Sequence, residues 1–130
     1  MATRMIAILF GLLLAACGTE QTADPVYVSE ADSGQTVVLT SGQELFVTLT
    51  SNATTGYSWS QRFTVDGVLG VVGETEYLPD QPIIPGSGGR ERFRFRADRT
   101  GRTTASFEYR RPWETSSAAA QTATYDVVVE

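Results

Sequence analysis

Apolar and polar residues alternate with a period of two along most of the chain after residue 35, and this pattern constrains the fold more than any other feature. In the segment 90–97, for example, Phe93, Phe95 and Ala97 alternate with arginines. Turn residues interrupt the pattern about every eight to twelve residues. The sequence therefore predicts an all-β chain, folded as an immunoglobulin-like antiparallel β-sandwich of about seven or eight strands. A single cysteine excludes an internal disulfide.

The same alternation predicts which side chains fill the core. Every second residue of an expected strand is apolar, and we expect these residues to face the opposite sheet. Trp59 is assigned to the core rather than to a binding platform. The predicted inward-facing residues are Leu45, Val47, Leu49, Tyr57, Trp59, Phe63, Phe93, Phe95, Ala97, Ala105, Phe107, Tyr109, Ala123, Tyr125, Val127 and Val129.

Residues 1–16 have the pattern of a signal peptide. Arg4 supplies a positive charge, residues 5–14 are apolar, and residues 14–17 read Leu-Ala-Ala-Cys. The apolar run is too short to span a bilayer as a helix. Cys17 at the end of such a segment resembles the bacterial lipobox, in which the cysteine is lipidated and becomes the mature N-terminus. A plain secretory peptide with an incidental cysteine is the alternative.

The lipobox resemblance implies a protein tethered in the cell envelope, outside the cytoplasm, without spanning the membrane. Gly18 follows the cysteine, which allows outer-membrane or periplasmic placement if the cell has two membranes. Residues 17–34 are polar and are expected to form a lipidated spacer, with an extended stretch at 26–28 that could add an edge strand. The folded domain is then expected over residues 35–130.

Charge and composition exclude several function classes. Residues 17–130 carry nine arginines against fifteen acidic residues, a formal charge of −6, and this balance argues against nucleic-acid binding. The chain has no histidine, so it cannot build a Ser-His-Asp or Cys-His nucleophile or a histidine-ligated metal site. We therefore expect neither an enzyme nor a cofactor.

Three coil stretches, 51–56, 79–89 and 111–121, are the longest inside the predicted domain, and shorter turns alternate with them. In an up-and-down succession of strands, alternate connections fall at the same end of the sandwich, so we expect these three loops to cluster. In the first loop, Asn52 can close a local turn through its side chain, and Gly56 permits a positive φ.

The arginines of the segment 90–97 form a row on its outward side. Such a row could bind a phosphate or another polyanion. We prefer the interpretation that acidic residues such as Glu108, on a neighbouring strand, face Arg92, Arg94 and Arg96. A charged row also discourages edge-to-edge pairing of strands.

The three loops together resemble those of the chagasin-like inhibitors of papain-family cysteine peptidases, over roughly residues 35–130. The first loop is similar to the family's Asn-Pro-Thr-Thr-Gly-aromatic motif, the second to its glycine-rich loop, and the third matches its Arg-Pro-Trp loop. A glycine-rich stretch alone is a weak signal, but the ordered triple on an all-β chain is specific. The matching residues are Asn52, Ala53, Thr54, Thr55, Gly56, Tyr57, Gly86, Ser87, Gly88, Gly89, Arg111, Pro112 and Trp113.

The resemblance implies a reversible, competitive inhibitor, expected as a monomer, whose three loops fill the active-site cleft of a papain-like peptidase. Thr54 and Thr55 would enter beside the catalytic cysteine, the glycine-rich loop would lie on the non-primed side, and Trp113 would stack on the primed side. Ala53 departs from the family's proline, which predicts a softer first loop.

Two other functions remain open on the sequence. A cell-surface sandwich lipoprotein could use the same loops to bind a glycan or an envelope protein. An enzyme would have to use Glu74, Glu76 or Asp80, the carboxylates near the second loop, but paired-carboxylate chemistry needs a cleft that a domain of this size hardly offers.

Overall fold

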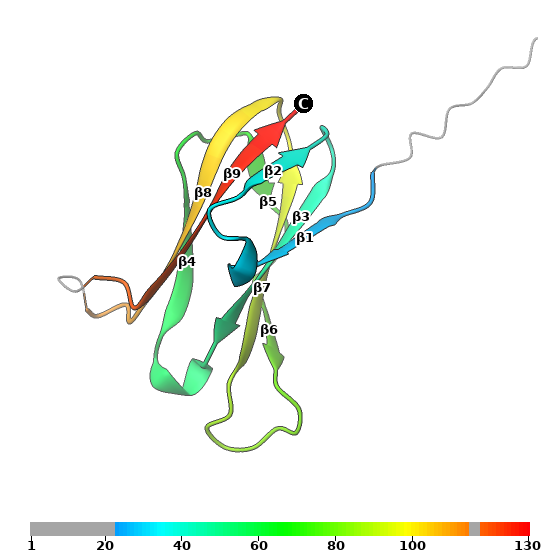
Figure 1. The fold of residues 1–130 in the computed structure, drawn as a ribbon. Coiled ribbons are helices and arrows are strands. Elements are labelled where there is room, and N and C mark those ends of the chain that lie inside the picture. Colours follow the sequence, from blue (N-terminus) through cyan, green and yellow to red (C-terminus); the bar gives the residue numbers. More distant parts are fainter. Residues whose placement is uncertain (1–22, 115–117) are drawn as a thin grey trace, which may run out of the picture.

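The computed structural model describes residues 23–114 and 118–130, so the expected signal peptide and Cys17 lie outside the described residues. These residues form two sheets that pack face to face (Figure 1), which confirms the all-β, immunoglobulin-like sandwich. The elements are β1 (Val26–Ser29), η1 (Glu30–Asp32), β2 (Thr36–Leu39), β3 (Glu44–Ser51), η2 (Ala53–Thr55), β4 (Ser58–Phe63), β5 (Leu69–Val71), β6 (Glu76–Pro79), β7 (Gly89–Ala97), β8 (Gly101–Arg110) and β9 (Gln121–Val129).

The first sheet has the order β1-β3-β7-β5, with β6 also paired to β7, and the second has the order β2-β9-β8-β4. The described strands number nine, more than the seven or eight expected. One reason is that the extended stretch in the predicted spacer forms β1, which pairs in parallel with β3. Among the described residues, the first strand therefore begins at Val26, before the expected start of the domain at residue 35. No helix among the described residues is long and apolar enough to cross a membrane.

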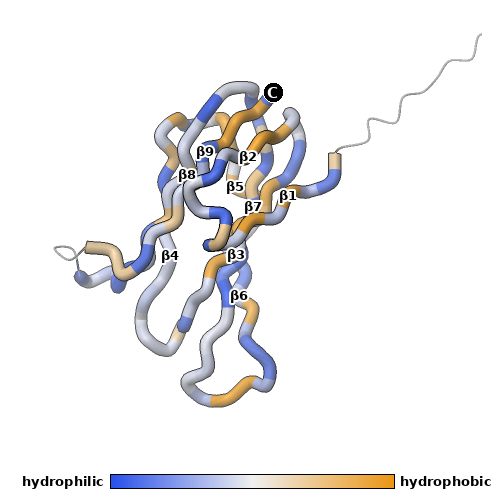
Figure 2. The backbone as a smooth tube through the Cα atoms, in the orientation of Figure 1, coloured by the Kyte–Doolittle hydropathy of each residue, from blue (hydrophilic) through white to orange (hydrophobic). Residues whose placement is uncertain are grey.

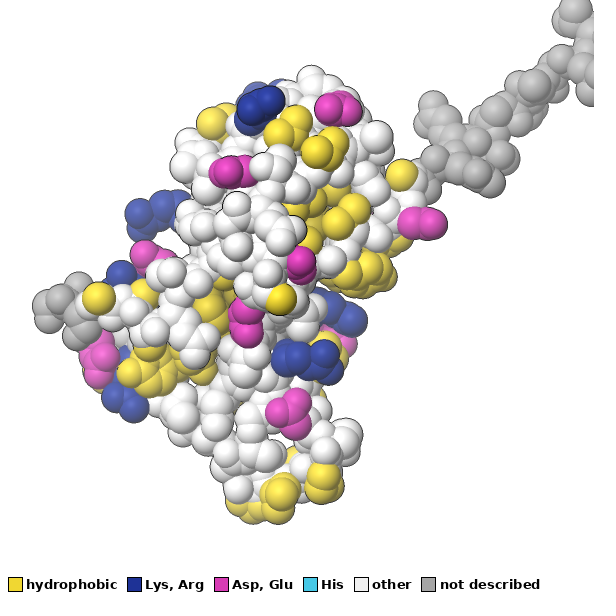
Figure 3. All heavy atoms as spheres, viewed as in Figure 1, with side chains coloured by type: hydrophobic (Ala, Val, Ile, Leu, Met, Phe, Trp, Pro, Cys, Tyr) yellow, Lys and Arg dark blue, Asp and Glu magenta, His cyan; other side chains and the backbone are white. Residues whose placement is uncertain are grey.

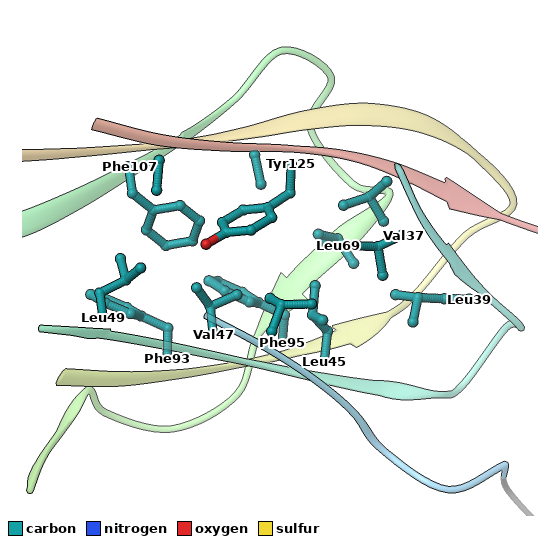
Figure 4. Close-up of a cluster of buried hydrophobic side chains, with 14 of the residues drawn as sticks. Val37, Leu39, Leu45, Val47, Leu49, Leu69, Phe93, Phe95, Phe107 and Tyr125 are labelled. Atoms are coloured by element: carbon teal, nitrogen blue, oxygen red, sulfur yellow. The ribbon is translucent and has the colours of Figure 1, made fainter. Parts of the chain in front are cut away.

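The alternation predicted from the sequence is visible along the strands (Figure 2), and its apolar members meet between the sheets (Figure 4). Phe95, Phe107 and Tyr125 are the largest fully buried side chains, and each contributes about 1.5–3 kcal/mol by leaving water. Of the predicted inward-facing residues, only Tyr57 and Phe63 are partly exposed, and both pack against the core. Trp59 is buried, as predicted.

The predicted partner of the arginine row is wrong. Arg92, Arg94 and Arg96 stand on β7 in the first sheet, whereas Glu108 stands on β8 in the second sheet and binds Arg110 at 3.0 Å. The error arises because β7 pairs with β3, β5 and β6 in the first sheet, so strands of that sheet, and not β8, stand beside the row. Since β7 lies inside its sheet, the row does not protect an edge either.

Acidic residues do neutralise the row, but they come from other positions. The ion pairs are Arg92–Glu76 at 2.7 Å, Arg94–Glu44 at 2.6 Å and Arg96–Asp98 at 2.8 Å. The hydrogen-bonded Arg94 guanidinium holds the pKa of the Glu44 carboxyl below its usual range. These pairs leave the row with little net attraction for a polyanion.

The environment of Tyr125 predicts how the stability of the fold changes at alkaline pH. Its buried hydroxyl donates a hydrogen bond of 2.7 Å to the carbonyl of Ser29. Burial, together with the nearby charges of Asp32 and Glu30, raises the pKa of Tyr125 to about 12 from an ordinary 10.0. Between these two values the unfolded chain releases the proton and the folded chain keeps it, so stability falls as pH rises.

We expect the free energy of unfolding, measured in urea from pH 8 to 12, to fall more steeply above pH 10 in the wild type than in Tyr125→Phe. The variant is less stable at neutral pH because it lacks the hydrogen bond. Absorbance of the folded protein at the phenolate band should show one tyrosine titrating late in the wild type only. Equal slopes in the two proteins would contradict the prediction.

Candidate functional site

The loop between β3 and β4 is a short, internally hydrogen-bonded prong. Asn52 is extended and caps η2, since its side chain accepts a hydrogen bond from the Thr54 amide at 3.1 Å and another from the Thr54 hydroxyl at 2.6 Å. The Thr55 hydroxyl donates to the Asn52 carbonyl at 2.7 Å. Gly56 ends the turn with φ +79°, a conformation that favours glycine. Asn52 and Gly56 thus act as predicted, and both threonines are exposed at the tip.

The second loop, residues 80–88, projects from the same end of the sandwich as the first. The Asp80 amide donates to the Gly88 carbonyl at 3.0 Å and closes its base. Nearer the tip, the Ser87 amide donates to the Ile84 carbonyl at 3.0 Å, and Gly86 between them has φ +80°. A proline followed by a glycine of positive φ is typical of a type II turn, so the tip is stiff.

Two apolar residues outside the predicted binding motifs form the tip of this loop. Ile83 and Ile84 are 68% and 59% exposed, and Figure 3 shows apolar side chains gathered at the end of the loop. Proline- and glycine-rich composition indicated only that the stretch was a surface loop. The usable signal was the Ile-Ile pair itself, because adjacent large aliphatic residues seldom stand in a solvent-exposed loop without a partner.

The glycine-rich end of the loop is less exposed than expected. Gly89 lies inside the sheet, paired with Ser51 on one side and Pro79 on the other. A methyl group on Gly89 would come within 2.5 Å of the Leu78 carbonyl, so glycine is needed there for close strand packing. Gly89 therefore offers no surface to a partner. Gly86 is exposed, and Ser87 and Gly88 are half-buried.

The third loop begins at Arg111 and contacts the first loop. The Arg111 guanidinium donates to the Thr55 carbonyl at 3.2 Å and to the Glu114 carboxylate at 3.4 Å. Trp113 is 67% exposed, yet its ring lies against Gly56, where a methyl group would meet it at 2.5 Å. The remainder of this loop includes residues 115–117, which are not among those described.

Direct contacts confirm that the three loops cluster at one pole. The Asn52 side-chain amide donates to the Gly86 carbonyl at 3.3 Å, which joins the first loop to the second, and Arg111 joins the third to the first. Ala53, Thr54, Thr55, Pro112 and Trp113 form the exposed part of this pole, together with the tip of the second loop. The assembly is a projecting surface with uncharged tips, which suits insertion into a cleft on another molecule.

The carboxylates near the second loop, Glu74, Glu76 and Asp80, are all exposed. Glu76 is bound to Arg92 on the outer face of the sheet. No group of three potential metal ligands occurs among the described residues.

Residues 38–129 match the model of the family described as "Chagasin family peptidase inhibitor I42". The chain belongs to the chagasin family. Amoebiasin-1 from Entamoeba histolytica is 34% identical over 88 residues, which cover 66% of this chain and 82% of that protein.

Solved structures show the same sandwich. The cysteine protease inhibitor EhICP2 from Entamoeba histolytica superposes with a TM-score of 0.73 at 21% identity, over 82% of this chain and 96% of that one. PbICP-C, solved in complex with falcipain-2, gives a TM-score of 0.54 at 19% identity, over 85% and 92% of the two chains. The chagasin family is one of peptidase inhibitors, which agrees with the expectation that this member is not an enzyme.

Ala53, where this chagasin-family chain lacks the expected proline, is predicted to accept one. It is the first residue of η2, a position whose amide has no partner within the helix, and Asn52 before it is already extended at φ −130° and ψ 99°. Ala53→Pro should restrict the free loop by about 0.4–1 kcal/mol and tighten inhibition about two- to fivefold.

The inhibition constant and the dissociation rate, measured for Ala53→Pro, the wild type and Ala53→Gly, test this expectation. The proline variant should dissociate more slowly than the wild type, and the glycine variant should dissociate faster. Equal constants for the proline variant and the wild type would show that the fold beneath the loop already removes its freedom.

Proposed function

We propose that the protein is a reversible, competitive inhibitor of papain-like cysteine peptidases that fills the active-site cleft with its three clustered loops. The observation that carries the proposal is that hydrogen bonds link the three loops at one pole of a chagasin-family chain. A sandwich of the same fold has been solved in complex with falcipain-2, which supports a peptidase as the partner.

The prong of Thr54 and Thr55 enters the cleft beside the catalytic cysteine. Its backbone is a 3₁₀ turn, tied by the Asn52 side chain and ended by Gly56. A substrate offers an extended segment to such a cleft, whereas this turn presents a bend. The peptidase is therefore occupied without receiving a peptide bond in a cleavable position.

The other two loops flank the prong. The tip of the second loop, with Ile83, Ile84 and Gly86, lies on the non-primed side, where aliphatic side chains and free backbone groups can be buried. Trp113 lies on the primed side and stacks on aromatic residues of the enzyme, since exposed tryptophans are frequent binding hot spots. The loops are linked before they bind, so little ordering entropy is lost on docking.

Titration of active papain with the purified chain, at several substrate concentrations, tests the proposal. We expect inhibition that high substrate relieves and that dilution reverses, with the inhibitor recovered uncleaved. Arg94→Ala, which alters the ion-paired face of β7, serves as the control and should inhibit like the wild type. Absence of inhibition at micromolar concentration, or stoichiometric cleavage of the chain, would refute the proposal.

We also propose that Cys17 carries a lipid anchor that holds the protein in the cell envelope. The anchor is compatible with inhibition, because β1 runs parallel to β3 and thus enters the fold at the pole opposite the three loops (Figure 1). Wild-type protein should fractionate with membranes and carry the mass of the lipid, and Cys17→Ser should lose both. Release of the wild type as a soluble, unmodified chain would favour a plain secretory peptide.

A further inference from the structure

Five side chains form a continuous column beneath and between the first and third loops. Ring centroids of Trp59 and Tyr109 lie 4.9 Å apart, and those of Tyr109 and Tyr57 lie 5.1 Å apart. The Arg111 guanidinium follows at 4.5 Å from the Tyr57 ring and 6.0 Å from the Trp113 ring. We call this set the aromatic column. It starts in the core and ends at the exposed indole of Trp113.

The buried end of the column is hydrogen-bonded to the backbone at the base of the first loop. The Tyr109 hydroxyl accepts a hydrogen bond from the Asn52 backbone amide at 2.9 Å. The Trp59 indole donates one to the Thr50 carbonyl, also at 2.9 Å. Tyr109 belongs to β8 and Asn52 follows β3, so this bond joins the two sheets at the base of the prong. Asn52 in turn caps the turn that carries Thr54.

The exposed end of the column ties the third loop to the first. The Arg111 guanidinium lies over the Tyr57 ring and also donates to the Thr55 carbonyl. Tyr57 is half-buried, and its ring already contacts Tyr109 and Arg111. Little of this ring is left to touch another molecule, although Tyr57 lies within the motif that the family resemblance assigns to peptidase binding.

We propose that Tyr109 and Tyr57 are positioning residues of the inhibitory surface. Tyr109 fixes the base of the prong through its hydroxyl, and Tyr57 sets the prong against Trp113 through its ring. Neither residue contacts the peptidase. The proposal rests on the proposed inhibitory function for its kinetic consequences, but the geometry of the free protein can be tested without a peptidase.

Tyr109→Phe removes only the hydroxyl, and Tyr125→Phe is its matched control. Both tyrosines are buried in the second sheet, and each hydroxyl makes one hydrogen bond to a backbone group, Asn52 for Tyr109 and Ser29 for Tyr125. We expect both variants to lose stability, because each loses a partly buried hydrogen bond. Only Tyr109→Phe should weaken inhibition, by about three- to tenfold, the factor that one hydrogen bond of ordinary strength represents.

Two variants of Tyr57 separate a role of its ring from a contact through its hydroxyl. Tyr57→Phe keeps the ring and should inhibit like the wild type, whereas Tyr57→Leu keeps apolar bulk without the ring and should inhibit about tenfold less. A contact through the hydroxyl would instead make Tyr57→Phe the weaker inhibitor, and that result would overturn the assignment of Tyr57.

Amide hydrogen exchange in the free protein provides the readout that needs no peptidase. Tyr109→Phe should speed exchange at Thr54 and Thr55 about three- to tenfold relative to the wild type, and Tyr125→Phe should leave these amides unchanged. Similar exchange and similar inhibition in the two variants would refute the positioning role of Tyr109. If the wild type does not inhibit any papain-like peptidase, the proposed function fails, and the exchange rates still decide whether the column orders the loops.

Discussion

Gly56→Ala is expected to weaken peptidase inhibition about 30- to 100-fold, although it adds a single methyl group. The new carbon would lie 2.5 Å from one ring atom of Trp113 and 3.4 and 3.5 Å from two others. Real side-chain carbons do not approach so closely, so the indole must leave its place. The φ of +79° adds backbone strain of about 1–2 kcal/mol.

The clash and the strain can be separated with a second glycine. Gly42 has φ +88°, and a methyl group there would meet no atom within 4 Å. Gly42 lies in the turn between β2 and β3, at the pole opposite the loops. Gly42→Ala should therefore lose a similar amount of stability in urea without a change in the inhibition constant. Gly86→Ala, with φ +80° and open space in the second loop, reports strain within the inhibitory surface itself.

Inhibition constants and urea unfolding of the three variants test the prediction together. If Gly56→Ala inhibits as well as Gly42→Ala, the contact between Gly56 and Trp113 does not matter for binding. If Gly86→Ala is as poor an inhibitor as Gly56→Ala, backbone strain at the pole, and not the position of the indole, explains the loss.

Local patterns of the sequence were enough to predict most of the strands, most of the core and the conformation of the first loop. Alternation identifies the buried side of each strand because successive side chains point to opposite faces. Asn52 and Gly56 could be assigned because each acts on residues within three positions of itself. The exposure of Trp113 followed from the proline before it, which ends the preceding strand.

Features that depend on which strands become neighbours could not be predicted in the same way. The partners of Arg92 and Arg94 depend on the pairing of β7 with β6 and β3, and the strand β1 depends on parallel pairing with β3. Gly89 was assigned to a binding loop because its sequence neighbours are glycines, but its burial comes from strands on both sides. The bond between Tyr109 and Asn52 joins residues 57 positions apart, and alternation only shows that Tyr109 points inward.

Trp113→Ala is expected to weaken inhibition about thirtyfold, which corresponds to about 2 kcal/mol, the loss typical of an interface anchor. The side chain is 67% exposed and lies against Gly56 and Arg111, so stability should change little. Tyr27→Ala is the matched control. Tyr27 is 65% exposed, stacks on Phe46 on the outer face of the first sheet, and lies away from the loops. Its loss should leave inhibition unchanged.

The double variant Gly56→Ala/Trp113→Ala shows whether the two single variants act through the same side chain. If the methyl group at Gly56 works by displacing the indole, removing the indole first should reduce its effect to about threefold, the part that backbone strain in the prong can still cause. A persistent thirtyfold effect of Gly56→Ala without the indole would mean that the methyl group acts on the prong of Thr54 and Thr55. Trp113 would then bind the peptidase independently, and the first and third loops would have to be treated as separate anchors.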